Sequence, residues 1–393
     1  MINERLHFDP VITGLRAYSV VAVLLFHFFH DLFPWLAGYK GVDVFFVISG
    51  YLIIGHINKS TRENEFSLLT FYAKRIVRLF PALLILLFIV FGLGYMFLLS
   101  EEFLSLAKYI FGSIFFFTNI ISWGVIFGGG EGVNYFHVNA EVKPLIHMWS
   151  LGVEEQFYAT FPLLVVLLIA LKRKILPYLA LLTLLSAMLS FAFSGVMPGA
   201  TFYLLPTRFW EIGLGGIIAI AAQNKSWINE FRFRFKYNIW IGVILICASL
   251  SFQFNSFPFL DIVLAVLGAA CILINTKQEG FSNLILNNRV TDVVGRISYP
   301  LYIFHFPVIA SYAIVGGIFT VSQKIGVLIL LFIFSYIVYR FVEIPFAKAP
   351  RRLSLIILGV LSLIIVTASS YVYLKSGLPD RITGNKELNT GTL

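Results

Sequence analysis

The chain has 393 residues, of which 59% are hydrophobic, 17% are aromatic and only 12% are charged, and its mean hydropathy is +0.88. Charged residues normally make up about a quarter of a soluble chain, so this composition excludes soluble, coiled-coil, collagen-like and disordered classes. Cys247 and Cys271 both lie in apolar runs, so neither a disulfide framework nor a metal site is expected. The net charge of +9 fits the basic cytoplasmic loops of membrane proteins, and nucleic-acid binding is not expected.

Eleven apolar runs approach or reach the roughly 17 to 25 residues that a membrane-spanning helix needs. They cover residues 11–30, 41–57, 79–99, 150–171, 176–194, 205–223, 238–254, 259–275, 298–316, 323–341 and 353–374. A twelfth run, 103–124, contains Lys108, Asn119 and Ser122. If the N-terminus is cytoplasmic and this run does not cross, 20 of the 29 Lys and Arg residues lie on the cytoplasmic side, as the positive-inside rule requires.

The sequence therefore predicts an all-α, polytopic membrane protein with about eleven transmembrane helices, a cytoplasmic N-terminus and an outside C-terminus. Residues 103–149 then form one large excursion on the outer side. We expect a membrane domain over 1–347, an extra transmembrane helix over 348–374 and a short outer tail over 375–393. No internal repeat of fixed period occurs, which disfavours the inverted-repeat transporter architectures.

Ionisable residues inside the apolar runs are the first candidates for function, because a charge near the bilayer centre costs about 3 kcal/mol even on lenient scales. Arg16 and His27 stand eleven residues apart in the first run. On an α-helix this spacing places both on one face, about 16 Å apart. A lone histidine in a membrane is commonly a packing residue, but an aligned arginine favours a functional role.

Asp43 opens the second run, within the segment Gly41 to Gly50, at the predicted outer level of His27. A carboxylate there would orient the His27 ring and stabilise its protonated form. The alternative is a charge at a helix N-terminus that the macrodipole favours.

Arg75 and Arg78 lie three residues apart on one helical face, at the cytoplasmic entry to the third run. Two interpretations fit this position. The side chains are either anchors that extend to the membrane surface or a fork that binds phosphates through paired hydrogen bonds.

Ser150 and Glu154 stand four residues apart at the start of the fourth run. Ser150 as a helix cap, with Glu154 one turn inside, would account for both. However, Glu154 and its neighbour Glu155 enter an apolar run and need partners, and we expect Arg208 and Glu211 at the outer end of the sixth run to provide them.

His305 falls about seven residues into the ninth run. The Gly128 to Gly130 run lacks the Lys and Ser/Thr of a P-loop, and neither HExxH nor a nucleophile elbow occurs. Nucleotide hydrolysis and metalloprotease chemistry are therefore not expected.

Several separated motifs occur in a fixed order along the chain. They are Gly14-Leu15-Arg16 with His27, Gly41-Val42-Asp43-Val44-Phe45-Phe46 through Ser49-Gly50, Arg75-x-x-Arg78, Trp149-Ser150-Leu151 with Glu154-Glu155-Gln156-Phe157-Tyr158, Phe202 through Arg208, and Tyr302 through His305 and Pro307. With these motifs, residues from about 11 to 347 resemble the membrane-bound acyltransferase family 3, which O-acetylates bacterial surface glycans. Lys143 departs from the pattern, since Asn is common there, and so does Pro300, where a small polar residue is common.

The resemblance implies a ten-helix acyltransferase unit plus one extra helix, and acetyl-CoA as a cytoplasmic co-substrate without a metal. The implied catalytic group comprises His27, supported by Arg16, Asp43 and Glu154. Arg75 and Arg78 would contact the CoA phosphates. The implied substrate-binding residues are Trp149, Ser150, Arg208, Glu211 and His305.

The implied reaction transfers an acetyl group across a bacterial inner (plasma) membrane to a hydroxyl of a surface glycan, such as lipopolysaccharide O-antigen. The partners would be membrane lipid and a glycan or lipid-linked glycan, which approaches from outside over residues 100–149. Members with an eleventh span usually carry an outer SGNH-hydrolase-like domain, and Gly377 to Arg381 looks like its lead-in, so that domain is either missing or cut off here. The alternative function is a transporter that exports a lipid-linked or acyl substrate past the same charges.

Overall fold

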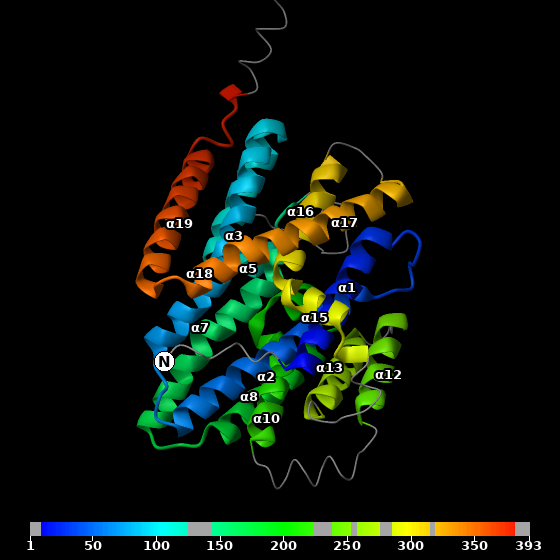
Figure 1. The fold of residues 1–393 in the computed structure, drawn as a ribbon, viewed down its shortest axis with the longest axis vertical. Helices are drawn as coiled ribbons and strands as arrows, with labels where there is room; N and C mark the ends of the chain where they lie inside the picture. Colours follow the sequence, from blue (N-terminus) through cyan, green and yellow to red (C-terminus); the bar gives the residue numbers. More distant parts are fainter. Residues whose placement is uncertain are drawn as a thin grey trace, which may run out of the picture. The chain divides into compact units, whose positions relative to one another are not determined.

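The computed structural model describes residues 9–124, 143–223, 238–252, 258–275, 285–314 and 319–381. Within these ranges the regular elements are helices (Figure 1). Eight helices there are long and apolar enough to cross a membrane, and a ninth crossing results if α15 (Arg289–Arg296) and α16 (Ser298–Ile314), bent by 65°, are counted as one span. The prediction of an all-α, polytopic membrane protein is therefore confirmed.

Each of the eleven predicted runs contains a helix. The eight spans and the bent pair account for nine of these runs. The other two runs contain the shorter apolar helices α12 (Asn238–Ser251) and α13 (Pro258–Ile274). The run 103–124 is broken into α4 (Ser100–Ile114) and α5 (Thr118–Trp123), each shorter than a membrane span. Residues 125–142 of the predicted outer excursion and the tail from 382 onward lie outside the described residues.

The chain forms two compact units that alternate along the sequence. The first unit comprises Met1–Leu68 and Glu154–Tyr302, and the second comprises Leu69–Val153 and Ile303–Leu393. Consequently the predicted site residues fall in both units.

The first unit is built around α2 and α10. Its further helices pack as the pairs α8 with α10, α12 with α13, and α1 with both α2 and α15. The bounds of those not yet given are α1 (Pro10–Phe29), α2 (Gly41–Arg62), α8 (Ile175–Phe193), α9 (Pro198–Tyr203) and α10 (Leu205–Ala222). A Cβ at Gly50 would lie 1.8 Å from the Ile212 carbonyl oxygen, and one at Gly215 would lie 2.0 Å from that of Val47. Glycine at these positions therefore lets the backbones of α2 and α10 touch.

The second unit contains the 30-residue helix α3 and, in the C-terminal part of the chain, α19, which packs against α4. Its helices not yet bounded are α3 (Leu68–Phe97), α17 (Val321–Val338), α18 (Ile344–Lys348) and α19 (Arg351–Leu374), while α7 (Trp149–Ala170) begins in this unit and continues into the first. The predicted extra helix over 348–374 corresponds to α19.

Candidate active site

Helix α1 carries Arg16 and His27 as an uninterrupted helix, so the predicted spacing of both residues along one face holds. Its start is defined by Asp9, whose carboxylate accepts a hydrogen bond from the Val11 amide at 3.0 Å, and by Pro10 at the first helical position. His27 lies in the last turn, where the helix dipole favours a positive charge. Both side chains are half-buried.

Arg16 is tied to α16 within the first unit. Its Nε donates a hydrogen bond to Ser298 Oγ at 3.2 Å, and that hydroxyl donates to the Gly295 carbonyl at 2.8 Å. The neighbouring α1 and α15 backbones are in close contact, because a Cβ at Gly295 would lie 2.1 Å from the Thr13 carbonyl oxygen. Ser298 therefore fixes the direction of the Arg16 side chain, and the sequence motifs did not single it out.

Asp43, Arg208 and Glu211 form a buried charge cluster between α2 and α10. Arg208 Nη1 lies 2.9 Å from Asp43 Oδ1 and 2.9 Å from Glu211 Oε1, and the three side chains are at most 4% exposed. Arg208 Nε donates to the Phe202 carbonyl at 3.1 Å. Such pairing is required, because an isolated buried charge would lose its hydration without compensation.

Lys40 adds a second buried cation beside this cluster. Its Nζ donates to the carbonyls of Ser249 at 2.6 Å and Phe252 at 2.9 Å, at the end of α12, and its charge acts on the Asp43 carboxylate. Lys40 and Arg208 together balance the formal charges of Asp43 and Glu211. Its position directly before the Gly41 motif was the only sequence signal that pointed to it.

Glu154 accepts hydrogen bonds from two side chains that were not predicted as its partners. Ser49 Oγ donates to Glu154 Oε1 at 2.8 Å, and the Tyr158 hydroxyl donates to Oε2 at 3.4 Å. Arg208 forms ion pairs with Asp43 on α2 and with Glu211 on its own helix. The motif containing Ser49 was noted from the sequence, but its link to Glu154 crosses from α2 to α7 and could not be inferred from spacing.

Trp149 and Ser150 are buried at the start of α7 in the second unit. The interpretation of Ser150 as a helix cap, one of two that the sequence left open, does not fit, because the helix begins one residue earlier, at Trp149. Ser150 Oγ lies 3.5 Å from the His147 carbonyl oxygen, to which it donates. A short helical turn over Ile146–Met148 runs directly into α7 and displaces the expected cap position.

His305 lies against a second histidine that sequence reasoning missed. The rings of His147 and His305 are 5.3 Å apart at 77°, and both residues are fully buried. His147 Nε2 lies 3.0 Å from the Ile303 carbonyl oxygen, and its ring stacks on Phe306. The signal was available, since His147 stands two residues before the Trp149 motif.

Arg75 and Arg78 lie near the beginning of α3, in the second unit. Arg75 is half-buried and Arg78 is exposed. Their spacing on a continuous helix leaves both on one side, so the two guanidinium groups can serve one anionic ligand. Among the described residues, no group of three or more His, Cys, Asp or Glu side chains is arranged to hold a metal ion.

A family model described as an acyltransferase domain matches residues 9–340. The chain therefore belongs to acyltransferase family 3, as its motifs predict. It is 30% identical to SACOL0978 of Staphylococcus aureus strain COL, which is provisionally named an O-acetyltransferase. The alignment extends over 368 residues and covers 88% of this chain and 58% of SACOL0978. The chain is also 30% identical over 356 residues to the O-acetyltransferase OatA of Staphylococcus aureus strain NCTC 8325, covering 86% of this chain and 57% of OatA.

The chain thus spans a little under three fifths of the length of these relatives. The comparison with solved structures gives no match.

Proposed function

We propose that this chain transfers an acetyl group from cytoplasmic acetyl-CoA to a hydroxyl of a surface glycan, within a bacterial plasma membrane. The observation that carries the proposal is the family match over 9–340, which includes the candidate catalytic residues of α1. The names of SACOL0978 and OatA support an acetyl group and an oxygen acceptor. Lipopolysaccharide O-antigen is one acceptor of this class.

The reaction exchanges a thioester for an oxygen ester. The acceptor hydroxyl gives its proton to His27 as its oxygen forms a bond to the acetyl carbonyl carbon. The bond from that carbon to the CoA sulfur then breaks, and the sulfur leaves as a thiol with the proton that His27 held. If His27 itself carries the acetyl group transiently, two such exchanges occur and the products are the same.

Arg16 and His27 serve different parts of the donor. About 16 Å of α1 separates them, because each residue of an α-helix adds about 1.5 Å. Arg16 is therefore too far along the helix for its guanidinium to reach a carbonyl beside the His27 ring. We assign it to the extended arm that joins the thioester to the CoA nucleotide, with Ser298 holding its direction.

Arg75 and Arg78 would bind the phosphates of CoA. Guanidinium groups bind phosphate through two parallel hydrogen bonds. The buried cluster of Asp43, Arg208 and Glu211 supports the site by holding α2 and α10 together. In this proposal the cluster positions the helices that carry the site, while His27 performs the proton transfer.

The test is acetyl-CoA binding to the full chain in lipid nanodiscs, followed by release of CoA thiol when a glycan is added. Arg75→Ala/Arg78→Ala is expected to weaken acetyl-CoA binding at least about tenfold, as the loss of charge-assisted hydrogen bonds predicts. Arg351→Ala/Arg352→Ala, which removes two exposed arginines at the start of α19, is the matched control. Wild type that is folded but binds no acyl-CoA would contradict the proposal, and substrate flux without thiol release would indicate transport.

A further inference from the structure

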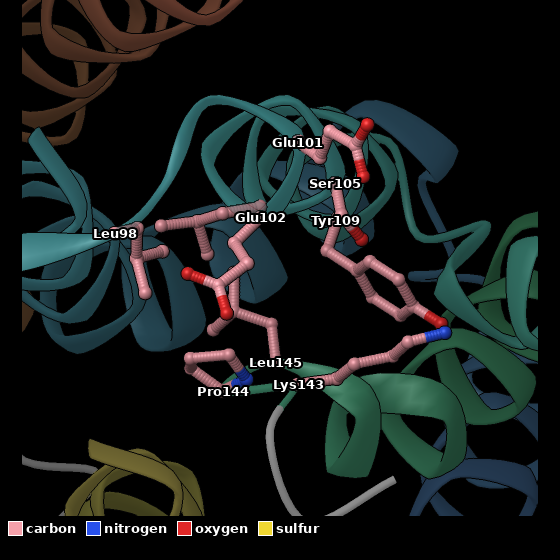
Figure 2. A pocket seen from close by; sticks show the side chains of 9 residues that line it. Leu98, Glu101, Glu102, Ser105, Tyr109, Lys143, Pro144 and Leu145 are labelled. Carbon is pink, nitrogen blue, oxygen red and sulfur yellow. The ribbon is translucent and has the colours of Figure 1, made fainter. Parts of the chain in front are cut away.

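A cavity of about 210 Å³ lies in the second unit, between α4 and the segment that leads into α7. Its polar lining comes from Glu101, Glu102, Ser105, Tyr109 and Lys143 (Figure 2), and the remaining wall is apolar. In Figure 2, Glu102 and Tyr109 extend from α4 toward Lys143 and Pro144 on the other side of the cavity. The cavity shares no residue with the predicted catalytic group.

Two of the polar lining residues, Glu102 and Tyr109, are already held by contacts with the start of α4 and with α5. Glu102 Oε2 accepts a hydrogen bond from the Leu99 amide at 2.9 Å, which closes the first turn of the helix. The Tyr109 hydroxyl lies 3.5 Å from Ser122 Oγ on α5. Glu102 and Tyr109 are seven residues apart and therefore lie on one face of α4, two turns from each other.

Lys143 carries a half-buried positive charge at the cavity. Its Nζ lies 6.0 Å from the centre of the Tyr109 ring. Within the described ranges no carboxylate lies within ion-pair distance of it. Burial and the nearby charge of Lys108 lower the pKa of Lys143 below its ordinary value. The Lys143 ammonium would therefore gain from a hydrogen-bond acceptor that a ligand supplies.

The charges of the lining restrict the ligand to a neutral one. Glu101 and Glu102 would repel an anion, and Lys143, with Lys108 close by, would repel a cation. A hydroxyl group can donate to a carboxylate and accept from an ammonium at the same time. A small ring with several hydroxyl groups thus satisfies both kinds of side chain, and its apolar face suits the leucine and proline wall.

The length of α3 relates this cavity to the candidate CoA-phosphate site. Arg78 and Leu98 are 20 residues apart, and Leu98 lines the cavity. At about 1.5 Å per residue this distance is about 30 Å, which equals the thickness of the hydrocarbon core. Since α3 crosses the membrane between them, the cavity lies at the membrane face opposite Arg75 and Arg78, where the acceptor is expected.

We propose that the α4 cavity is a subsite that holds one neutral sugar unit of the acceptor glycan. This inference rests on the proposed function, because it takes the acceptor to be a glycan that arrives on the side opposite the donor. Lys143 and Glu102 bind the sugar hydroxyls, and Tyr109 forms the aromatic wall. The subsite positions the glycan and takes no part in the proton transfer at His27.

The test is saturation-transfer NMR on the full chain in nanodiscs. The probes are methyl glycosides of glucose, galactose and N-acetylglucosamine, with glucuronate as a charged comparison. Saturation transfer to at least one neutral glycoside is expected in wild type. Lys143→Met should reduce it at least about fivefold, since a hydrogen bond to a charged group is lost. Glu102→Gln, which removes the charge but preserves the turn that Glu102 closes, should reduce it about threefold.

Lys59→Met and Glu65→Gln, at exposed positions in the first unit, are the matched controls and should leave the signal unchanged. The subsite is overturned if no neutral glycoside receives saturation, if glucuronate is favoured over them, or if the two cavity variants retain the signal. Acetyl-CoA binding by wild type is measured on the same samples. Its presence without sugar binding overturns only the subsite, and its absence overturns the proposed function.

Discussion

Arg208 Nη1 lies 2.9 Å from Asp43 Oδ1, although these residues stand 165 positions apart on different helices. The same nitrogen lies 2.9 Å from Glu211 Oε1. One guanidinium therefore joins α2 to α10 about two helical turns before Gly50 and Gly215, where the two backbones touch. We expect the cluster to support the candidate active site, so its loss should affect folding before it affects chemistry.

Arg208→Met should destabilise the protein by about 3 to 5 kcal/mol, because two buried carboxylates would lose their shared cation. Arg208→Lys should recover only part of this loss, since a single ammonium does not reproduce the planar fork that reaches two carboxylates and the Phe202 carbonyl. Thermal unfolding in detergent measures both variants. Arg173→Met, at an exposed arginine of the same unit, is the control. If Arg208→Met unfolds at the same temperature as wild type, the cluster does not stabilise the folded protein.

His27→Ala should reduce acetyl transfer by at least about 100-fold, which is the usual contribution of a general base. Acetyl-CoA binding should change little, because the proposed phosphate contacts are on α3. His30→Ala is a close control, since His30 is exposed and lies just beyond the last turn of α1. Retained transfer in His27→Ala, with normal protein levels, would remove His27 from the mechanism.

The helices could be predicted almost completely from hydropathy, because burial in lipid leaves a long apolar run for each span. The largest error in a helix start concerns α3, which begins at Leu68 and not near residue 79. Lys74, Arg75 and Arg78 lower the hydropathy of its first turns, yet their charged ends lie half-buried or exposed while the backbone remains helical. Polar residues at a membrane surface therefore hide the true length of a helix.

The side-chain pairs of the site were harder to predict than the helices. Asp43 and Arg208 were both chosen from the sequence, but their pairing was not predicted, and neither was the hydrogen bond from Ser49 to Glu154. Charge complementarity alone allows several pairings among buried ions. Helix packing selects one of them, and close contacts such as Gly50 with Ile212 are not visible as a sequence period. The role of Asp43 in orienting His27 stays a prediction.

The stability of the protein should depend on pH through Lys143. Burial and Lys108 lower the pKa of Lys143 in the folded state below its ordinary value of 10.5. At a pH below this lowered pKa, the Lys143 charge lowers the free energy of unfolding by its full amount. Between the pKa of Lys143 in the folded state and its ordinary value of 10.5, the unfolded state binds more protons, so the stability of the protein rises with pH. Above pH 10.5 Lys143 is neutral in both states and no longer destabilises the folded protein.

Lys143→Met should accordingly raise the unfolding temperature at pH 7, and its advantage over wild type should shrink as the pH approaches and passes 10.5. Burial raises the pKa of the facing Tyr109 above its ordinary value of 10.0. Unfolding temperatures of both proteins between pH 7 and pH 11 provide the measurement. A constant difference across this range would show that the Lys143 charge is not the cause.

Arg381 should hold the segment after α19 against the end of α3. Its guanidinium donates to the carbonyls of Gly94, Tyr95 and Leu98 and lies 4.7 Å from the centre of the Phe103 ring. Gly377 has a φ of +82°, and a Cβ there would lie 1.8 Å from the Ser100 carbonyl oxygen, so the segment turns back directly onto α4. These contacts also fix Leu98, which lines the α4 cavity.

Arg381→Ala should therefore increase hydrogen exchange both in residues 372–381 and in residues 98–102, and should lower stability by about 2 kcal/mol, because hydrogen bonds to a charged group are lost. Gly377→Ala should produce the same pattern through a different cause, since its side chain cannot fit. Arg352→Ala, at the opposite end of α19, should change neither region. If exchange becomes faster in residues 372–381 but not in residues 98–102, the segment after α19 contacts α3 and α4 but does not stabilise the residues that line the cavity.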